Sequence, residues 1–243
     1  MKARPADQLL LIEVASLDAI IRSADHQRRN PAQTARVNEL LAQRQSESAV
    51  LTGLLGERDD ARAELGRLES DVALVDARAA RDTERLASTS NVKEAQGLEH
   101  ELESLAKRKS DLEDAELVIM ERLETADAAV AAQEAVIAEI NAAGAQASSD
   151  GKAAVAAATA TWEAATRDRE AVAARVPDDL LAAYDRIAAR GVGAGLLRRK
   201  ACEACHMVLS GTDLQTLRQA APDDVVMCPE CGAILVRTDE SGL

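Results

Sequence analysis

Apolar residues recur in alternating steps of three and four along two long stretches of the chain. The first stretch runs from 37 to 86 and repeats through Val37, Leu40, Leu51, Leu54, Leu65, Leu68, Val72, Val75 and Leu86. The second runs from 95 to 140 through Leu98, Leu102, Leu105, Leu112, Ile119, Leu123, Val130, Ile137 and Ile140. A heptad sustained for this long is typical of a coiled coil and not of a short amphipathic helix. We therefore predict two long helices that bury a narrow apolar seam.

The segment between these stretches is STSNVKE, residues 88–94. Serine, threonine and asparagine compete with helical backbone hydrogen bonds and favour turns. Asn91 followed by Glu94 resembles a capping box at the start of a helix. Because the link is short, the two helices should lie antiparallel, as a hairpin whose tip lies near 87–93.

Two break signals lie far from this tip, one beyond the end of each seam. Asn30 and Pro31 precede the first seam, and SSDG at 148–151 follows the second. Proline removes an N–H donor, and SSDG has turn chemistry. Counting from the tip places both breaks at one level, so we predict a kink near 30–31 and 148–151. Alternatively, Asn30 caps a new helix with Pro31 in its first turn.

The hairpin should extend past the kink, with 8–29 against 152–173, so that it covers residues 1–176. Residues 177–195 then predict a short helix, LLAAYDRIAAR, and a glycine-rich flexible joint, GVGAG. No Lys-Ser/Thr pair follows GVGAG, which argues against a phosphate loop. In 196–243, HMVL and GAILVRT predict short strands, and Thr212 with Gln215 resembles a cap for a short helix.

All four cysteines lie in this last segment, as two C-x2-C pairs formed by Cys202, Cys205, Cys228 and Cys231. Two such pairs can hold a tetrahedral ion, and four thiolates leave no open position for a reactive water. A segment this small needs a staple beyond hydrophobic burial. The pairs therefore predict one structural Zn²⁺ per chain. His206 offers an alternative ligand, and a thioredoxin-like redox pair lacks the βαβ pattern that it requires.

The predicted fold class is thus mainly α: a long kinked antiparallel coiled-coil hairpin followed by a small C-terminal β zinc ribbon. Composition agrees, because the chain has 243 residues with no Phe, one Tyr and one Trp, too few large aromatics for a thick core. No signal-peptide core or transmembrane stretch is evident, so we expect a cytoplasmic protein with no membrane partner. In that compartment cysteine pairs are more often metal ligands than disulfides.

The formal net charge of −13 argues against a chain that binds nucleic acid over its whole surface. One basic cluster leads into the first cysteine pair, with Asp185 the only acidic residue opposing it, and it consists of Arg186, Arg190, Arg198, Arg199 and Lys200. Its candidates for contact with nucleic acid or a partner are Arg190, Arg198, Arg199 and Lys200. Alternatively, these cations offset the negative charge of a zinc–tetrathiolate centre.

The hairpin tip supplies a second set of candidate contact residues, which are Arg81, Arg85, Asn91 and Lys93. The alternative is a solvated turn whose cations are balanced by Asp82, Glu84 and Glu94. Neither set resembles a catalytic constellation, and a hairpin of two helices offers no obvious pocket for a small-molecule substrate.

Taken together, these segments resemble the bacterial family of C4-type zinc ribbon proteins with an N-terminal coiled-coil hairpin, often described as nucleic-acid-binding Zn-ribbon proteins. The resemblance is carried by LLLIEVASLDAII, RDTERLASTSNVKE, KRKSDLED, LLAAYDRI, GVGAG, CEAC and CPECGAILV. It implies zinc ligands at the four cysteines and no enzymatic activity. Some members are described as binding an alternative sigma factor and messenger RNA.

From the residues and this resemblance we expect a non-enzymatic adaptor that binds a protein partner, in transcription or its regulation. The alternative is an RNA- or DNA-binding zinc ribbon protein that uses the basic lead-in to the ribbon. The scarcity of aromatic residues disfavours a base-stacking platform for single strands.

Overall fold

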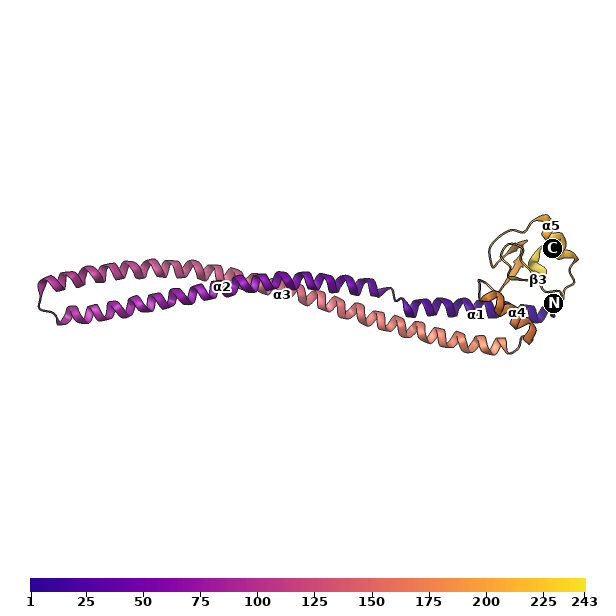
Figure 1. The fold of residues 1–243 in the computed structure, drawn as a ribbon, viewed down its shortest axis with the longest axis horizontal. Helices are drawn as coiled ribbons and strands as arrows, with labels where there is room; N and C mark the ends of the chain where they lie inside the picture. The colour runs from indigo at the N-terminus through magenta and orange to yellow at the C-terminus, as the bar shows by residue number, and fades with distance from the viewer. The chain divides into compact units, whose positions relative to one another are not determined.

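The computed structural model describes residues 1–243 and divides them into two compact units (Figure 1). The hairpin unit is Ala35–Ser148, and the ribbon unit combines Met1–Thr34 with Ser149–Leu243. The helices are α1 (Pro5–Arg29), α2 (Gln33–Ser88), α3 (Val92–Ala173), α4 (Asp178–Ala188) and α5 (Gly211–Gln219). The strands are β1 (Ala194–Arg198), β2 (Ala201–Cys202), β3 (Val226–Met227) and β4 (Ile234–Val236), followed by a 3₁₀ turn, Asp239–Ser241. The predicted fold class, mainly helical with a small C-terminal sheet, is confirmed.

In the hairpin unit α2 and α3 run antiparallel and are joined at Thr89–Asn91 (Figure 1). The predicted apolar seam positions are all buried or half-buried. The most buried apolar positions are Leu40, Ala61, Leu98, Leu105, Leu112, Ile119, Val130 and Ile140. Ion pairs such as Lys109–Asp76, at 2.8 Å, cross between the helices beside the seam. Exposed pairs contribute only about 0.2–1 kcal/mol each, so the apolar seam supplies most of the hairpin's stability.

The two predicted breaks have different outcomes. At the first, α1 ends at Arg29 and α2 begins at Gln33, and the Asn30 side-chain amide donates to the carbonyl of His26 at 3.2 Å. Asn30 therefore caps the end of α1 and not the start of α2. At 148–151 the turn signal does not interrupt the helix, because α3 is continuous there, although the boundary between the two compact units falls at this level, after Thr34 and Ser148. One glycine costs a helix only about 1 kcal/mol, which continued backbone hydrogen bonding and packing outweigh. Gly151 faces α2, where an added Cβ would lie 3.4 Å from the Cβ of Gln33.

The ribbon unit contains a four-stranded sheet in the order β2-β1-β4-β3, in which only β1 and β4 pair in parallel. Side chains alternate between its two faces, as the strand period requires. One face packs on α1 and α4 through Ala194, Ile234, Val236, Leu11, Val14, Leu180 and Tyr184. The other face packs on α5 and the cysteine turns through Leu197, Leu235, Leu214, Leu217, Cys202 and Cys228. The zinc ribbon sheet is therefore covered on both faces.

The predicted flexible joint at GVGAG is also wrong, because β1 begins at Ala194. A Cβ at Gly193 would overlap the ring of Tyr184, and a Cβ at Gly195 would lie 2.8 Å from that of Ala204. These glycines permit close packing and do not serve as a hinge. Residues 196–243 are consequently not a separate domain, since β1 and β4 share a core with α1 and α4.

The N-terminal residues add a second connection within the ribbon unit. The amide of Ala3 donates to the carbonyl of Asp223 at 2.8 Å, and the amide of Val225 donates to the carbonyl of Met1 at 3.1 Å. The side chain of Lys2 also donates to the Asp223 carboxylate at 3.0 Å. These bonds fix the loop before β3 against the start of α1.

Candidate metal centre

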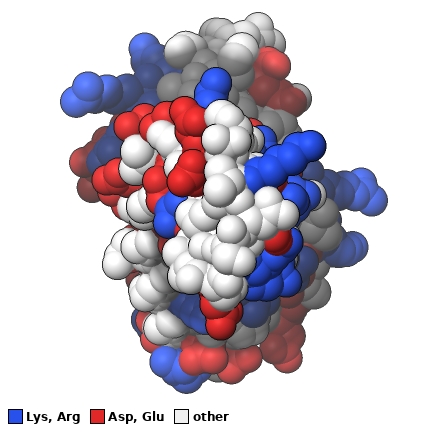
Figure 2. All heavy atoms as spheres, turned by 90° about the vertical axis from the view of Figure 1, so that its left-hand side faces the viewer, with Lys and Arg blue, Asp and Glu red and all other residues white.

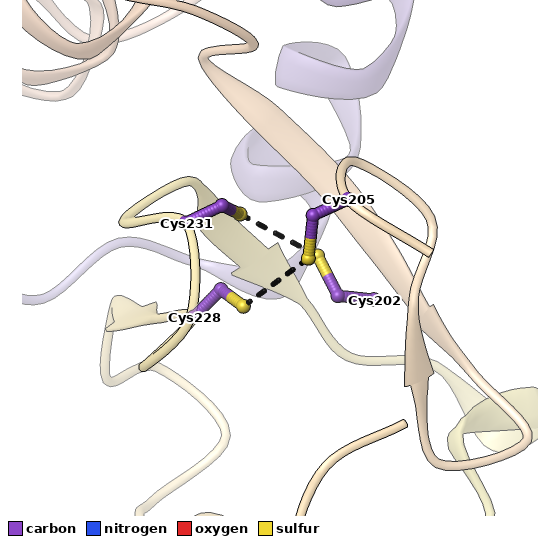
Figure 3. A group of neighbouring side chains, drawn as sticks. All are labelled: Cys202, Cys205, Cys228 and Cys231. Atoms are coloured by element: carbon purple, nitrogen blue, oxygen red, sulfur yellow. Dashed lines mark hydrogen bonds between the residues drawn. The ribbon is translucent and has the colours of Figure 1, made fainter. Parts of the chain in front are cut away.

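The four predicted cysteines lie together, although they come from two parts of the ribbon (Figure 3). Cys202 ends β2 and Cys205 lies in the turn after it, whereas Cys228 and Cys231 lie in the turn between β3 and β4. All four Sγ atoms fall within 4.8 Å of one another. The Sγ atoms of Cys202 and Cys231 lie 4.0 Å apart, and those of Cys205 and Cys228 lie 3.9 Å apart.

The two cysteine turns have the same backbone hydrogen bonds. In the first, the amide of Cys202 donates to the carbonyl of Met207 at 2.9 Å, and the amide of His206 donates to the carbonyl of Cys202 at 2.7 Å. In the second, Cys228 and Gly232 make the corresponding bonds at 2.8 and 2.9 Å. The turn-closing residue has a positive φ in both, 60° for His206 and 74° for Gly232. Glycine adopts this conformation freely, whereas histidine does so at a cost.

The donor set fits Zn²⁺. A Zn–S bond of about 2.3 Å in a tetrahedron separates neighbouring sulfurs by about 3.8 Å, close to both distances above. All four cysteines are free and much too far apart for disulfides, whose S–S bond is about 2.05 Å. His206 does not belong to the cluster. The four thiolates complete a tetrahedral shell and leave no position for a reactive water, as in structural zinc sites.

The electrostatics of the cluster make zinc binding sensitive to pH. Burial raises the pKa of the Cys202 thiol to about 12 and also raises the pKa of Cys231. The backbone N–H of Met207 lowers the pKa of Cys205. Zinc binds thiolates, so loading the site releases protons, and acid favours loss of the metal.

The predicted basic lead-in is not one patch. Arg190 precedes β1, whereas Arg199 and Lys200 follow it in the turn to β2, at the opposite end of the strand. Arg198 is paired with two carboxylates, Glu240 at 2.6 Å and Glu203 at 3.2 Å, and the hydrogen bond that it donates to Glu240 raises the pKa of its guanidinium.

The expectation that Asp185 alone opposes these cations is therefore wrong, since Asp185 is paired with Arg169 at 2.7 Å. Arg199 and Lys200 both have positive φ values, 48° and 68°, as a tight two-residue hairpin turn requires. Their backbone role is to close the β1–β2 turn.

At the tip, Asn91 caps α3, because its side-chain oxygen accepts from the amides of Lys93 and Glu94 at 3.0 and 3.4 Å. Arg85 is paired with Glu94 at 3.3 Å, whereas Arg81 and Lys93 have no ion pair. Figure 2 faces this turn and shows both signs of charge around uncharged atoms at the front. Asp82 continues the heptad spacing of the first seam, and it is accordingly only 8% exposed.

Tyr184 connects three helices of the ribbon unit, a role that the sequence did not predict. Its hydroxyl donates to Asp18 of α1 at 2.6 Å, and Arg169 of α3 donates to the same carboxylate at 2.9 Å. Burial, followed by the bond to Asp18, raises the pKa of Tyr184 well above its ordinary value. The one feature of the sequence that could have indicated this role is that Tyr184 is the only tyrosine of the chain.

None of the helices combines the length and the apolar character that crossing a lipid bilayer would require. Two family models match the chain. Residues 14–192 match the CT398-like coiled coil hairpin domain, and residues 201–235, which include all four cysteines, match the C4-type zinc ribbon domain.

Similar proteins cover almost the whole chain. Protein Rv2229c of Mycobacterium tuberculosis strain H37Rv is 32% identical over 241 residues, or 98% of each chain. A solved structure from Mycobacterium smegmatis is 31% identical, covers 98% of this chain and 100% of its own, and has a TM-score of 0.80. CT398 from Chlamydia trachomatis shares the fold at 13% identity, with a TM-score of 0.58 over 96% of this chain and 98% of its own. The chain therefore belongs to the family of CT398-like coiled-coil hairpin proteins, and its hairpin is followed by a C4-type zinc ribbon.

Proposed function

We propose that this protein is a non-enzymatic cytoplasmic adaptor that binds a protein partner, in transcription or its regulation, while zinc maintains the ribbon. The observation that carries the proposal is an apolar turn on the outer surface of α3. Leu117, Val118 and Met120 are 59%, 63% and 52% exposed, although they flank the buried seam residue Ile119. Exposed apolar side chains that gather in this way are typical of protein contact surfaces.

The chemistry of the chain supports binding in preference to catalysis. The four cysteines form the only cluster of three or more His, Cys, Asp or Glu side chains suited to a metal ion. Their closed shell would have no place for a substrate. The family resemblance supports a role in transcription.

Nucleic-acid binding through the lead-in is the weaker candidate. Its Arg198 is already paired with two carboxylates, and its other cations lie at opposite ends of β1. A net charge of −13 and the absence of phenylalanine weaken it further.

The test is photo-crosslinking in cells, with a photoreactive amino acid at Leu117 and, as a control, at the exposed Glu103 on the same helix. We expect Leu117 to yield discrete protein adducts that survive nuclease treatment and that Glu103 does not give. The variant with Arg198, Arg199 and Lys200 changed to Glu should give the same adducts. Adducts that disappear with nuclease or with this charge reversal would instead support the nucleic-acid candidate.

A further inference from the structure

A groove of about 700 Å³ lies beside the second cysteine turn, within the ribbon unit. It is formed by the last turn of α4, the loop that leads to β1, the end of β3 and that cysteine turn. Its lining includes Arg186, Arg190, Ile187, Val192, Met227 and Cys231. The zinc site itself does not require this groove, because the four sulfurs already complete the metal's shell.

The groove carries two arginines without acidic partners. Arg190 makes no side-chain hydrogen bond, and Arg186 donates only to the carbonyl of Ala182 in its own helix, at 3.2 Å. Their nearest acidic neighbour in sequence, Asp185, is occupied by Arg169. Glu230, in the cysteine turn, is paired with neither arginine. In a chain with 42 acidic and 29 basic residues, two adjacent unpaired arginines are a local reversal of charge.

These arginines do not act as hydrogen-bond donors to the metal ligands. No hydrogen bond joins either guanidinium to a cysteine sulfur, although Cys231 lines the same groove. The two arginines can therefore offset the negative charge of the zinc centre only by long-range electrostatics and not by hydrogen bonds. Both side chains are exposed and can turn toward a bound group.

The groove also offers apolar surface between its charges. Val192 is 40% exposed and Met227 is 49% exposed, and Ile187 is half-buried beside them. Methionine adapts its shape readily to different apolar partners. A nucleic-acid backbone would leave this surface unused, and the groove has no aromatic side chain on which a base could stack.

We propose that this groove binds an acidic peptide segment of a partner protein, with carboxylates on Arg186 and Arg190 and an apolar side chain against Val192 and Met227. A guanidinium presents parallel N–H donors that match a carboxylate, and an apolar anchor beside the ion pairs supplies the burial that exposed ion pairs lack. The inference rests on the proposed adaptor function and assigns it a site separate from the α3 surface.

The experiment is a selection of a random peptide library on the zinc-loaded full chain. Enriched peptides are then synthesised with a fluorophore, and their affinity is measured by anisotropy. We expect them to combine Asp or Glu with Leu, Ile, Met or Phe. Changing Arg186 and Arg190 together to Glu should weaken binding by at least about tenfold. Met227→Gln should weaken it through the apolar contact.

The matched control changes Arg199 and Lys200 to Glu, which alters the net charge equally but at the other end of β1. This control should retain the peptide affinity, and zinc content and circular dichroism should be unchanged in all variants. The proposal is overturned by enriched peptides without acidic residues, by no enrichment, or by equal losses in the control. It is also overturned if a random RNA pool binds the groove and loses affinity with Arg186 and Arg190. Photo-crosslinking at Leu117 does not involve the groove, so those adducts would persist if only this inference fails.

Discussion

Changing Tyr184 to Phe should destabilise the ribbon unit by about 1.5–3 kcal/mol, the usual contribution of a hydrogen bond to a charged group. The tyrosine is only 1% exposed, and its hydroxyl donates to Asp18 at 2.6 Å. Phenylalanine keeps the packed ring and removes only this donor. The carboxylate keeps its bond from Arg169, so the loss should stay within that range. Because the pKa of Tyr184 is raised, the hydroxyl remains a donor throughout the neutral range and the loss should not vary with pH there.

Urea unfolding, monitored by tryptophan fluorescence, measures this loss of stability in the ribbon unit. Trp162 is the only tryptophan and lies in the ribbon unit, with the guanidinium of Arg28 4.4 Å from its ring centroid. Thr161→Ala is the control, because that exposed hydroxyl bonds only to the carbonyl of Ala157 in its own helix. It should change stability by about 0.5 kcal/mol or less.

A double-mutant cycle with Asp18→Ala isolates the pair. If the hydroxyl and carboxylate interact as described, the two losses should be non-additive by about 1 kcal/mol or more. A Tyr184→Phe loss no larger than that of the control, or additive losses in the cycle, would refute the reasoning.

Three further outcomes are expected. Gly193→Ala should destabilise the ribbon unit because its methyl overlaps the Tyr184 ring, whereas Gly191→Ala, which meets no atom within 4 Å, should be tolerated; equal effects in urea unfolding would contradict this. Gly151→Ala should stabilise the protein by about 0.5–1 kcal/mol because α3 is continuous there, and a loss of stability in urea unfolding would contradict a regular helix at this position. The bond from Arg4 lowers the pKa of Asp7, so its stabilisation is present above the unfolded value of about 3.9 and is lost as pH falls. The difference in urea midpoint between wild type and Asp7→Asn should therefore shrink from neutral pH toward acid, and a constant difference would argue against the ion pair.

The features predicted correctly from sequence are those with a local signature. The heptad seam can be recognised from the seven-residue period of its apolar residues, and residues such as Leu112 and Ile119 are buried as expected. The spacing within each C-x2-C pair is enough to predict that the two thiolates can bind the same metal ion. Asn91 also caps α3 as predicted, since a cap depends only on the next turn.

The errors arose where contacts distant in sequence decide the structure. The segment that contains the start of β1 was predicted to be a flexible joint, because glycines such as Gly193 and Gly195 are common in flexible segments. In the structure these two glycines instead allow neighbouring residues to pack closely against the backbone. The bonds of the N-terminus to the loop at 223–225 have no local pattern. At α5 the N-cap is Ser210 and not Thr212, because it is the Ser210 hydroxyl that accepts a hydrogen bond from the amide of Asp213. HMVL contributes only an isolated bridge, at Val208, and no strand.

The zinc content of the purified full chain tests the central claim most directly. Metal analysis should find one zinc per chain in the wild type and in His206→Gly, which relieves the positive φ without touching the four ligands. Cys228→Ser should lose the metal, while circular dichroism still reports the α2–α3 hairpin, whose seam contains no ribbon residue. A wild type without zinc, or full zinc occupancy in Cys228→Ser, would contradict a ribbon built on these four cysteines.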